Sequence, residues 1–570
     1  MAASLAHLIA AQLVVQLAAG EPSADSAAIL SSARDAQAAF ERVRFQHLPW
    51  TGRSGGGECD ERVGRFCLWH SGDEDAWTAP PEKPGVRQER ARLIDRLRSA
   101  VNAIPGDGWI VGQLVRYLLE ADRAPEALAA ARRCAAERWW CRALEGFAYH
   151  STGRYADAEA AFDRAVDEMP ADERATWLDL SLLFEGDDAD IYERADSLRR
   201  TLLVRRMWWL ADPLYVVPGN GRLSEHFARL VMDRLQERAR SPEGMRWGRD
   251  MRELLLRYGW PVGWERIRPL MHETGRPATV AHHARGSRDF LPPLASLDNP
   301  RSISLDDWRL DDDDGHSEYG PGYAITFAAL PHQFAMFPRG DSAVFVARFS
   351  LSDSTGSAAL DAGIESAMFV AVSESAQAAH GLSVLTDSGG WVRVTAASRP
   401  AVVSIEALDR RERRAWRARH GIGAALTVPG RLALSDVLLV RGDSALPRTL
   451  DEALPVALTT TGIAVGERVG LYWELFDGAG MARTVTCVLR VRRSGRGWVS
   501  RFAERIGLAD GDTPVALRWE AHSEAASVSG YALLLELPGV DPGEYTIELS
   551  MHAYDQAPLT VRRTLHVVER

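Results

Sequence analysis

The spacing of apolar residues changes once along the chain, near residue 323. Before that point apolar positions recur every three or four residues, as in 26–45, which is the period of an amphipathic helix. From Tyr323 onward apolar and polar residues alternate, as in 342–352, and a period of two predicts strands. The pattern therefore predicts a multidomain fold in which helical domains precede antiparallel β domains.

One helical segment, residues 140–170, has the spacing of a complete helix-turn-helix unit. Small residues stand where two helices would cross closely, and aromatic residues would fill the groove between them. The positions that define the unit are Gly146, Tyr149, Gly153, Ala158, Phe162, Ala165 and Pro170. Their pattern resembles the tetratricopeptide repeat. Such a unit cannot bury its apolar face alone, so the resemblance implies that neighbouring units stack on it.

The same spacing extends on both sides of this unit. Trp109 stands where Trp140 stands one unit later, and the same offset carries Ala127 onto Ala158. Downstream, residues 177–184 and 191–203 are expected to supply a further helical pair. We therefore expect residues 85–203 to form a short tetratricopeptide-like α-solenoid of about three repeats.

Residues 204–273 form a Trp-rich segment with two helical patterns, 225–235 and 249–258. Its marked positions, in order, are Trp209, Asp212, Pro213, Asn220, Glu225, Arg229, Trp247, Asp250, Arg257, Tyr258, Gly259 and Pro261. This succession resembles the bacterial domain named for its Gly-Trp-x-Thr-Asp (GWxTD) motif, although Arg246 and Arg249 replace the Gly and the Thr. That family often occurs in exported proteins with tetratricopeptide repeats and a C-terminal β domain, so the resemblance implies an architecture and a location, not a reaction.

Asp250 stands beside arginines in this segment. It could serve as a general base or as a buried ion-pair partner. We interpret it as an ion-pair partner, because a charged group in such surroundings usually needs one.

Residues 274–322 read as a linker, because Gly and Pro recur through them. They contain the adjacent pair His282 and His283, expected in an exposed loop, and an acidic run at 311–314. An EF-hand alignment of that run would place Leu310 at the first ligand position and Pro321 at the last, where oxygen ligands are needed. We therefore expect a solvated acidic loop and no metal site, and the alternative is a weak, irregular calcium site.

Two sets of short strands follow, at 323–443 and 456–570, joined by a link at 444–455. The first set is expected at 342–352, 367–372, 391–396, 402–407 and 432–440. The second is expected at 467–476, 485–493, 514–522, 531–539, 545–554 and 560–569. Short strands separated by Gly, Ser and Asp turns predict two immunoglobulin-like β-sandwiches.

Residues 1–20 carry an apolar run from Leu5 to Ala19, with small residues just before Glu21. This pattern predicts a secretory signal peptide. No Lys or Arg precedes the run, so the first helix of a cytoplasmic protein is the alternative. Residues 21–84 then form a helix and a Cys-containing cap. No later segment has the length of apolar sequence that a transmembrane helix needs.

The five cysteines bear on the same question of location. Cys59 and Cys67 are neighbours in sequence, as are Cys134 and Cys141, while Cys487 stands alone. In an exported protein the first four would form two local disulfides. The alternative is five unpaired thiols. No CxxC spacing occurs, so a zinc site is not expected.

Composition excludes one class of function. The 570-residue chain has a net charge of -11, and its basic residues are dispersed, whereas phosphate recognition needs a concentrated basic face. Nucleic-acid binding is therefore not expected.

The chain also lacks the common catalytic signatures. The sequence contains no GxSxG elbow, P-loop or HExxH helix, and we expect no cofactor and no enzymatic activity. The leading hypothesis is an exported scaffold of the bacterial envelope that binds protein partners through the solenoid. One alternative is a glycan-binding or glycan-processing envelope protein that uses the β domains on a polysaccharide. Another is a cytoplasmic repeat adaptor. A concave pocket with convergent, pKa-shifted polar groups would speak against a plain scaffold.

Overall fold

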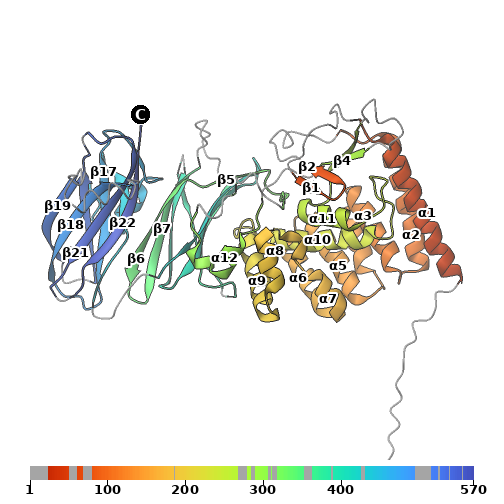
Figure 1. The fold of residues 1–570 in the computed structure, drawn as a ribbon, viewed down its shortest axis with the longest axis horizontal. Coiled ribbons are helices and arrows are strands. Elements are labelled where there is room, and N and C mark those ends of the chain that lie inside the picture. Colours follow the sequence, from red (N-terminus) through yellow and green to blue (C-terminus); the bar gives the residue numbers. More distant parts are fainter. Residues whose placement is uncertain are drawn as a thin grey trace, which may run out of the picture.

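Helices occupy the first half of the molecule and sheets the second, which confirms the predicted order. The computed structural model describes residues 24–50, 61–68, 80–184, 186–267, 279–283, 289–305, 310, 317–351, 363–375, 377–386, 389–424, 431–494, 515–523, 527–537, 539–554 and 556–569. A helical part, a first β unit and a second β unit lie in a row, with α1 at one end and the C-terminus at the other (Figure 1). None of the helices within these ranges combines the length and apolar character that a bilayer crossing requires.

The helical part has one continuous apolar core. Its helices are α1 (Ala24–His47), α2 (Pro84–Ala103), α3 (Gly108–Glu120), α4 (Ala124–Arg132), α5 (Arg138–Ser151), α6 (Tyr155–Glu168), α7 (Ala171–Trp177), α8 (Gly186–Arg194), α9 (Ser197–Ala211), α10 (Gly221–Gln236) and α11 (Arg249–Tyr258). Consecutive helices from α1 to α6 contact one another. Buried residues of α1 through α11 share the same core, for example Phe40, Trp140 and Leu255.

Helices α5 and α6 cross closely at Gly146. A Cβ atom at this position would lie 2.8 Å from the ring of Phe162, so only glycine leaves room for the aromatic side chain. Gly153 has a φ of 74° in the turn between the helices, a left-handed conformation that favours glycine. The small and aromatic positions of 140–170 therefore lie at the helix crossing and the turn.

The helical pair expected after α6 differs from the prediction. Helix α7 ends at Trp177 and a single 3₁₀ turn, η1 (Ser181–Leu183), follows, so 177–184 is not a helix. Instead α10 packs on α5 and α6, where Phe227 lies 5.3 Å from Phe162 and 6.1 Å from Trp177 between ring centroids. These aromatic contacts bring the Trp-rich segment into the helical core, and the boundary expected at 203 falls inside α9.

Two small hairpins border the helices. One consists of β1 (Glu61–Val63) and β2 (Phe66–Leu68), and Val63 and Phe66 pack against Met251 and Leu254 of α11. The other consists of β3 (Gly263–Ile267) and β4 (Thr279–His283). His282 and His283 therefore lie in a strand paired with β3, not in the expected loop.

The segment expected as a linker is largely packed against its neighbours. Phe290 and Leu294 are buried, and α12 (Leu294–Asp298), followed by the 3₁₀ turn η2 (Pro300–Ser302), contacts α9. Arg206 of α9 donates to the carbonyl of Leu297 at 2.7 Å. The Gly and Pro content of this segment predicted a linker. These contacts with distant residues cannot be inferred from composition. The acidic run 311–314 lies outside the described residues.

The first β unit consists of two sheets around one core. Their strand orders are β10-β11-β7-β6 and β5-β13-β12-β8-β9. The strands are β5 (Thr326–Ala329), β6 (His332–Arg339), β7 (Ser342–Ser350), β8 (Ile364–Ala371), β9 (Ala379–Leu382), β10 (Val384–Thr386), β11 (Gly389–Ala397), β12 (Ala401–Asp409) and β13 (Arg414–Ile422). All neighbours pair antiparallel except β5 and β13. Phe345 from one sheet and Ile405 and Trp416 from the other belong to the shared core.

The second β unit repeats this arrangement. Its strands are β14 (Leu432–Leu434), β15 (Leu438–Arg441), β16 (Gly462–Ala464), β17 (Val469–Asp477), β18 (Arg483–Arg493), β19 (Val515–Ser523), β20 (Val528–Leu535), β21 (Gly543–His552) and β22 (Leu559–Val568). One sheet joins β14, β15 and β20 to β17, and the other has the order β16-β22-β21-β18-β19. The strand expected at 432–440 is two strands and belongs here, because β14 and β15 pair with β17.

The link expected at 444–455 contains a helix, α13 (Leu450–Val456), that packs between the two β units. Its Leu454 shares a buried apolar cluster with Phe337 of β6, Leu438 of β15 and Tyr472 of β17. The two β units therefore meet through a continuous apolar junction.

Candidate functional site

A pocket of about 1000 Å³ opens where the helical part meets the first β unit. Its helical wall comes from the α3–α4 turn at Asp122, the α5–α6 turn at Gly153 and helix α10. Residues 258–262 and 318–323 form further walls, and the β12–β13 loop closes the β side. The pocket therefore gathers segments that are far apart in the sequence.

Three charged or ionisable side chains form the polar centre of this pocket. Glu225 and Arg229 lie one turn apart on α10, and the Nε atom of Arg229 donates to Oε1 of Glu225 at 2.7 Å. His150, near the end of α5, places Nε2 2.6 Å from Oε2 of Glu225. Helix α10 begins at Asn220, whose side chain accepts from the amide of Leu223, a typical N-cap contact. The cap and the helical spacing therefore position the cluster.

Arg229 also closes the end of α11. It donates to the carbonyls of Leu256 and Arg257 at 2.8 and 2.9 Å, which satisfies acceptors that a helix end leaves open. Gly259 follows at a φ of 84°, and a Cβ atom there would lie 2.9 Å from the guanidinium of Arg229. Glycine at this position therefore lets the arginine approach the backbone.

The electrostatics of the cluster favour a fixed charge arrangement. Burial alone would raise the pKa of Glu225, but Arg229 and the hydrogen bond from His150 outweigh burial and hold the pKa below its usual range. The other ring nitrogen of His150, Nδ1, lies 2.9 Å from the hydroxyl of Ser224. Ser224 is fully buried. Both ring nitrogens of His150 are thus engaged, and the serine is closed to a substrate.

Tyrosines form the wall next to this cluster. Tyr155 and Tyr319 are each 4% exposed, and their ring centroids lie 5.5 and 6.3 Å from that of His150. The hydroxyl of Tyr155 accepts from the amide of Gly322 at 3.2 Å. Burial raises the pKa values of Tyr319 and Tyr323 well above normal. These tyrosines therefore stay neutral and give the pocket a rigid polar wall.

Two residues with unusual backbone conformations lie on opposite walls. Asp122 has a φ of 56° and Arg413 a φ of 52°, and within the described ranges they are the non-glycine residues with positive φ. Both line the pocket. Strained conformations of this kind often occur at functional sites.

The GWxTD-like residues fall into three places. Tyr258, Gly259 and Pro261 line the pocket, together with Glu225 and Arg229. Arg257 contributes its carbonyl to Arg229.

A second group of these residues lies at the junction with the first β unit. The carbonyls of Asp212 and Pro213 accept from Arg417 of β13 at 3.3 and 3.2 Å. Burial raises the pKa of Asp212 well above normal, with a smaller opposing effect of Arg419. The backbone carbonyl of Trp209 accepts a hydrogen bond from the hydroxyl of Tyr215.

The third group faces α10 and the first hairpin. Trp247 donates to Asp233 at 2.7 Å. Asp250 accepts from Arg65 of the β1–β2 turn at 2.8 Å, and this hydrogen bond lowers the pKa of Asp250. Asp250 is therefore an ion-pair partner, as interpreted from the sequence.

Most repeat-packing residues support the helices, and one reaches the pocket. Ala158, Phe162 and Ala165 are buried between helices, whereas Gly153 lines the pocket. Tyr149 accepts from Arg132 at 2.6 Å, which ties α5 to the end of α4. Pro170 precedes the first residue of α7.

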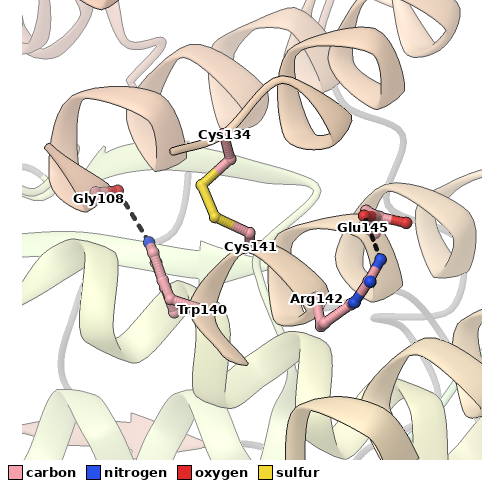
Figure 2. Close-up of a disulfide and its surroundings, with 6 residues drawn as sticks. All are labelled: Gly108, Cys134, Trp140, Cys141, Arg142 and Glu145. Atoms are coloured by element: carbon pink, nitrogen blue, oxygen red, sulfur yellow. Dashed lines mark hydrogen bonds and ion pairs between the residues drawn. A yellow bond between two sulfur atoms is a disulfide. The ribbon is translucent and has the colours of Figure 1, made fainter. Parts of the chain in front are cut away.

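Cys134 and Cys141 form a disulfide with Cα atoms 5.6 Å apart. Figure 2 shows the bond joining the end of α4 to the start of α5, next to Trp140, which donates to the carbonyl of Gly108 at 2.8 Å. Cys487 is buried and unpaired. Cys59 lies outside the described residues, so the pair expected between Cys59 and Cys67 stays a prediction. Within the described ranges, no three His, Cys, Asp or Glu side chains come together in a way that could hold a metal ion.

Sequence reasoning did not find several residues of the pocket. His150 and Tyr155 belong to the repeat pattern and have no distinguishing neighbours in sequence. Arg413 lies in the run Asp-Arg-Arg-Glu-Arg-Arg at 409–414, a signal that could have marked a charged turn. That these segments meet depends on the tertiary fold.

Comparison with known proteins gives no family. No family model matches the chain, and no curated protein matches it. The C-terminal domain of Wzt shares 13% identity over 25% of this chain and 77% of that chain, with a TM-score of 0.17. A Bacteroides uniformis β-glucuronidase shares 7% identity over 40% and 26%, with a TM-score of 0.17. A red sea bream transglutaminase shares 8% over 43% and 32%, with a TM-score of 0.14. Likenesses this weak carry no argument.

Proposed function

We propose that this chain is an exported, non-enzymatic binding protein of the bacterial envelope, and that the pocket receives a segment of a protein partner. The observation that carries the proposal is the pairing inside the pocket. Glu225 is held ionised by Arg229, and both ring nitrogens of His150 are engaged. Ser224, the hydroxyl partner of His150, is fully buried, so this Ser-His-Glu arrangement lacks the exposed nucleophile that acyl transfer needs. The paired charges can still position a ligand.

The pocket suggests a binding surface different from the solenoid surface that the sequence predicted. A plain scaffold would bind through the solenoid alone, but the polar groups converge at the junction with the first β unit. A bound segment would touch both parts. Tyr155 and Tyr319 bury their rings, whereas the partly exposed Trp260 and Tyr323 also line the pocket, so a glycan stays the alternative ligand.

We also propose the finer architecture that the sequence suggested. The close crossing of α5 and α6 at Gly146 supports a tetratricopeptide-like solenoid. The gathering of Glu225, Arg229 and Gly259 supports a divergent GWxTD-type segment. Paired sheets around a common core support two immunoglobulin-like β-sandwiches.

Export rests on two features. The apolar run at 5–19 has signal-peptide character, and the Cys134–Cys141 disulfide is typical of an oxidising compartment. The alternative, a cytoplasmic adaptor, predicts free thiols at both positions.

Photo-crosslinking tests the proposal. A benzoylphenylalanine at Thr152, which is exposed on the pocket rim, should yield one discrete protein adduct in envelope fractions. Unlabelled wild-type protein should compete for that adduct. The matched control is Thr564, exposed on the distant strand β22, which should give no such adduct. Equal adducts from both positions, or none from Thr152, would contradict the proposal.

A further inference from the structure

The loop between β12 and β13 concentrates positive charge at the pocket. It contains three arginines within residues 410–413, and two of them, Arg410 and Arg413, line the pocket. The carboxylate of Asp409 accepts from the amides of Arg411 and Glu412 at 2.9 and 3.0 Å. The Asp409 carboxylate therefore stabilises the turn, and its negative charge faces backbone N–H groups.

Arg413 is held over the pocket without a carboxylate partner. Its guanidinium donates to the carbonyl of Gly322 at 2.9 Å, and it makes no ion pair with a described acidic residue. Arg410 donates to Glu365 twice, at 2.6 and 3.2 Å, but both side chains are nearly half exposed, so water screens the pair and a ligand carboxylate can compete for the arginine. The β wall therefore has donors available to an anion.

The carboxylates on the helical wall are mostly neutralised. Glu225 is paired with Arg229 and His150, and Glu120 is paired with Arg116 at 2.9 Å. Asp122 is exposed and makes no ion pair with another described residue. The pocket thus presents available positive charge on its β wall, one open negative charge on its helical wall, and the half-buried Glu318 on the 318–323 wall.

We propose that the pocket binds an extended acidic peptide whose carboxylates pair with Arg413 and Arg410. The proposal rests on the proposed function and names the chemistry of the partner segment. A planar guanidinium binds a carboxylate through two parallel hydrogen bonds. A cavity of about 1000 Å³ is at the upper end of ordinary ligand pockets and accommodates a few residues of extended chain. Asp122 would repel an acid on the helical wall, so the acidic group is directed to the β wall.

Fluorescence anisotropy of the full chain with labelled hexaglutamate tests this inference. Hexaglutamate should bind at least about tenfold more tightly than hexaserine, and added salt should weaken it. Arg413→Asn should weaken binding about tenfold while keeping a residue that tolerates the left-handed backbone. Asp122→Asn should strengthen binding a few-fold. Arg492→Glu is the control, because Arg492 is exposed on β18 in the second β unit, and this variant should leave the affinity unchanged.

Three outcomes would overturn the inference. The first is no difference between hexaglutamate and hexaserine. The second is an affinity for hexaglutamate that Arg413→Asn leaves intact, with unchanged thermal stability. The third is pocket-dependent binding of trigalacturonate without binding of hexaglutamate, which would assign the site to an acidic glycan. If the Thr152 adduct forms while hexaglutamate fails, the partner pocket stands and only its acidic specificity is wrong.

Discussion

Gly259 sets the geometry of the pocket through the side chain that it lacks. Its left-handed φ of 84° and the 2.9 Å approach to Arg229 impose two separate requirements. A Cβ atom there would strain the backbone and displace the guanidinium that holds Glu225. The pocket therefore depends on a position that makes no side-chain contact.

We predict that Gly259→Ala lowers the free energy of unfolding by about 2–4 kcal/mol, because backbone strain and displacement of Arg229 add. Gly153→Ala is the matched control. Gly153 also has a positive φ, of 74°, but a Cβ atom there would meet nothing within 4 Å. Gly153→Ala should therefore lower the free energy of unfolding by only about 1–2 kcal/mol, through backbone strain alone. Urea denaturation measures both, and equal costs would contradict the role given to Arg229.

Titration of His332 makes the folding stability depend on pH. Burial lowers the pKa of His332 to about 4, and the neighbouring His420 adds to the effect. The unfolded chain titrates near the ordinary value of about 6.5, so it binds more protons than the folded chain between these values. The stabilisation is present above about pH 6.5 and is lost as the pH falls towards 4.

We predict that wild-type protein loses about 1–3 kcal/mol through His332 over this range, after allowance for its partial exposure. His332→Gln removes the titrating group and should flatten the pH dependence of Tm between pH 6.5 and 4. Because Arg563 also disfavours the charged form of His332, the measurement should be repeated at high salt. An unchanged pH profile in the variant would show that other groups control acid unfolding.

At the scale of elements, strands β12 and β13 attach the first β unit to the helices through buried charge. Arg419 donates to Glu406 at 2.9 Å, and the two side chains are 1% and 0% exposed. Arg419 also donates to the carbonyl of Leu210 at 2.7 Å, and Glu406 accepts from the amide of Val216 at 2.9 Å. Each charge thus holds backbone groups of the 210–216 segment.

We predict that Glu406→Gln costs about 3–5 kcal/mol, because Arg419 is left buried without its counter-charge. The paired replacement Glu406→Leu with Arg419→Met removes both charges but leaves the Leu210 carbonyl and the Val216 amide without their partners, so it should recover only a small part of this loss. Glu365→Gln, which breaks the exposed pair with Arg410, should cost less than about 1 kcal/mol. Thermal unfolding ranks the three, and a Glu406→Gln cost as small as that of Glu365→Gln would contradict the argument.

The Cys134–Cys141 disulfide should stabilise the connection between α4 and α5. It closes a short loop with a sequence separation of 7, for which the chain-entropy model gives about 2 kcal/mol. Reductant should lower the Tm of the wild type accordingly. A variant with serine at Cys134 and Cys141 should have the lower Tm and no response to reductant. A wild-type Tm insensitive to reductant, with the bond shown to be reduced, would contradict this.

The elements that sequence could predict are those whose pattern is local. The six strands expected in 467–569 correspond to β17–β22, because alternation along each strand matches its burial. Strand β13 was not predicted, because nothing near Arg417 and Arg419 in the sequence indicates that these arginines are buried. They are buried because carbonyls of the 210–213 segment accept their hydrogen bonds, a partner far away in sequence. Gly259 belongs to the GWxTD-like pattern and lines the pocket. Arg413 also lines it, but no sequence pattern connects the two residues, because they meet only in the tertiary fold.

At the scale of the whole molecule, two buried junctions join three parts in a row (Figure 1). The junction of the helices with the first β unit combines the buried pair Glu406 and Arg419 with an apolar cluster that includes Leu214 and Leu408. The junction between the β units combines an apolar cluster that includes Leu454 with the ion pair of Arg339 and Glu474. The relative positions of the parts are thus set by packed side chains.

These two junctions differ in how they would respond to a pulling force along the row. Each junction contains packed apolar side chains and an ion pair, and these ion pairs differ in their access to water. Arg419 and Glu406 are 1% and 0% exposed, whereas Arg339 at the β–β junction is 22% exposed. Because water can replace the contacts of an exposed pair more readily, a load applied at the C-terminus would extend the β–β joint first and leave the pocket intact until a higher force.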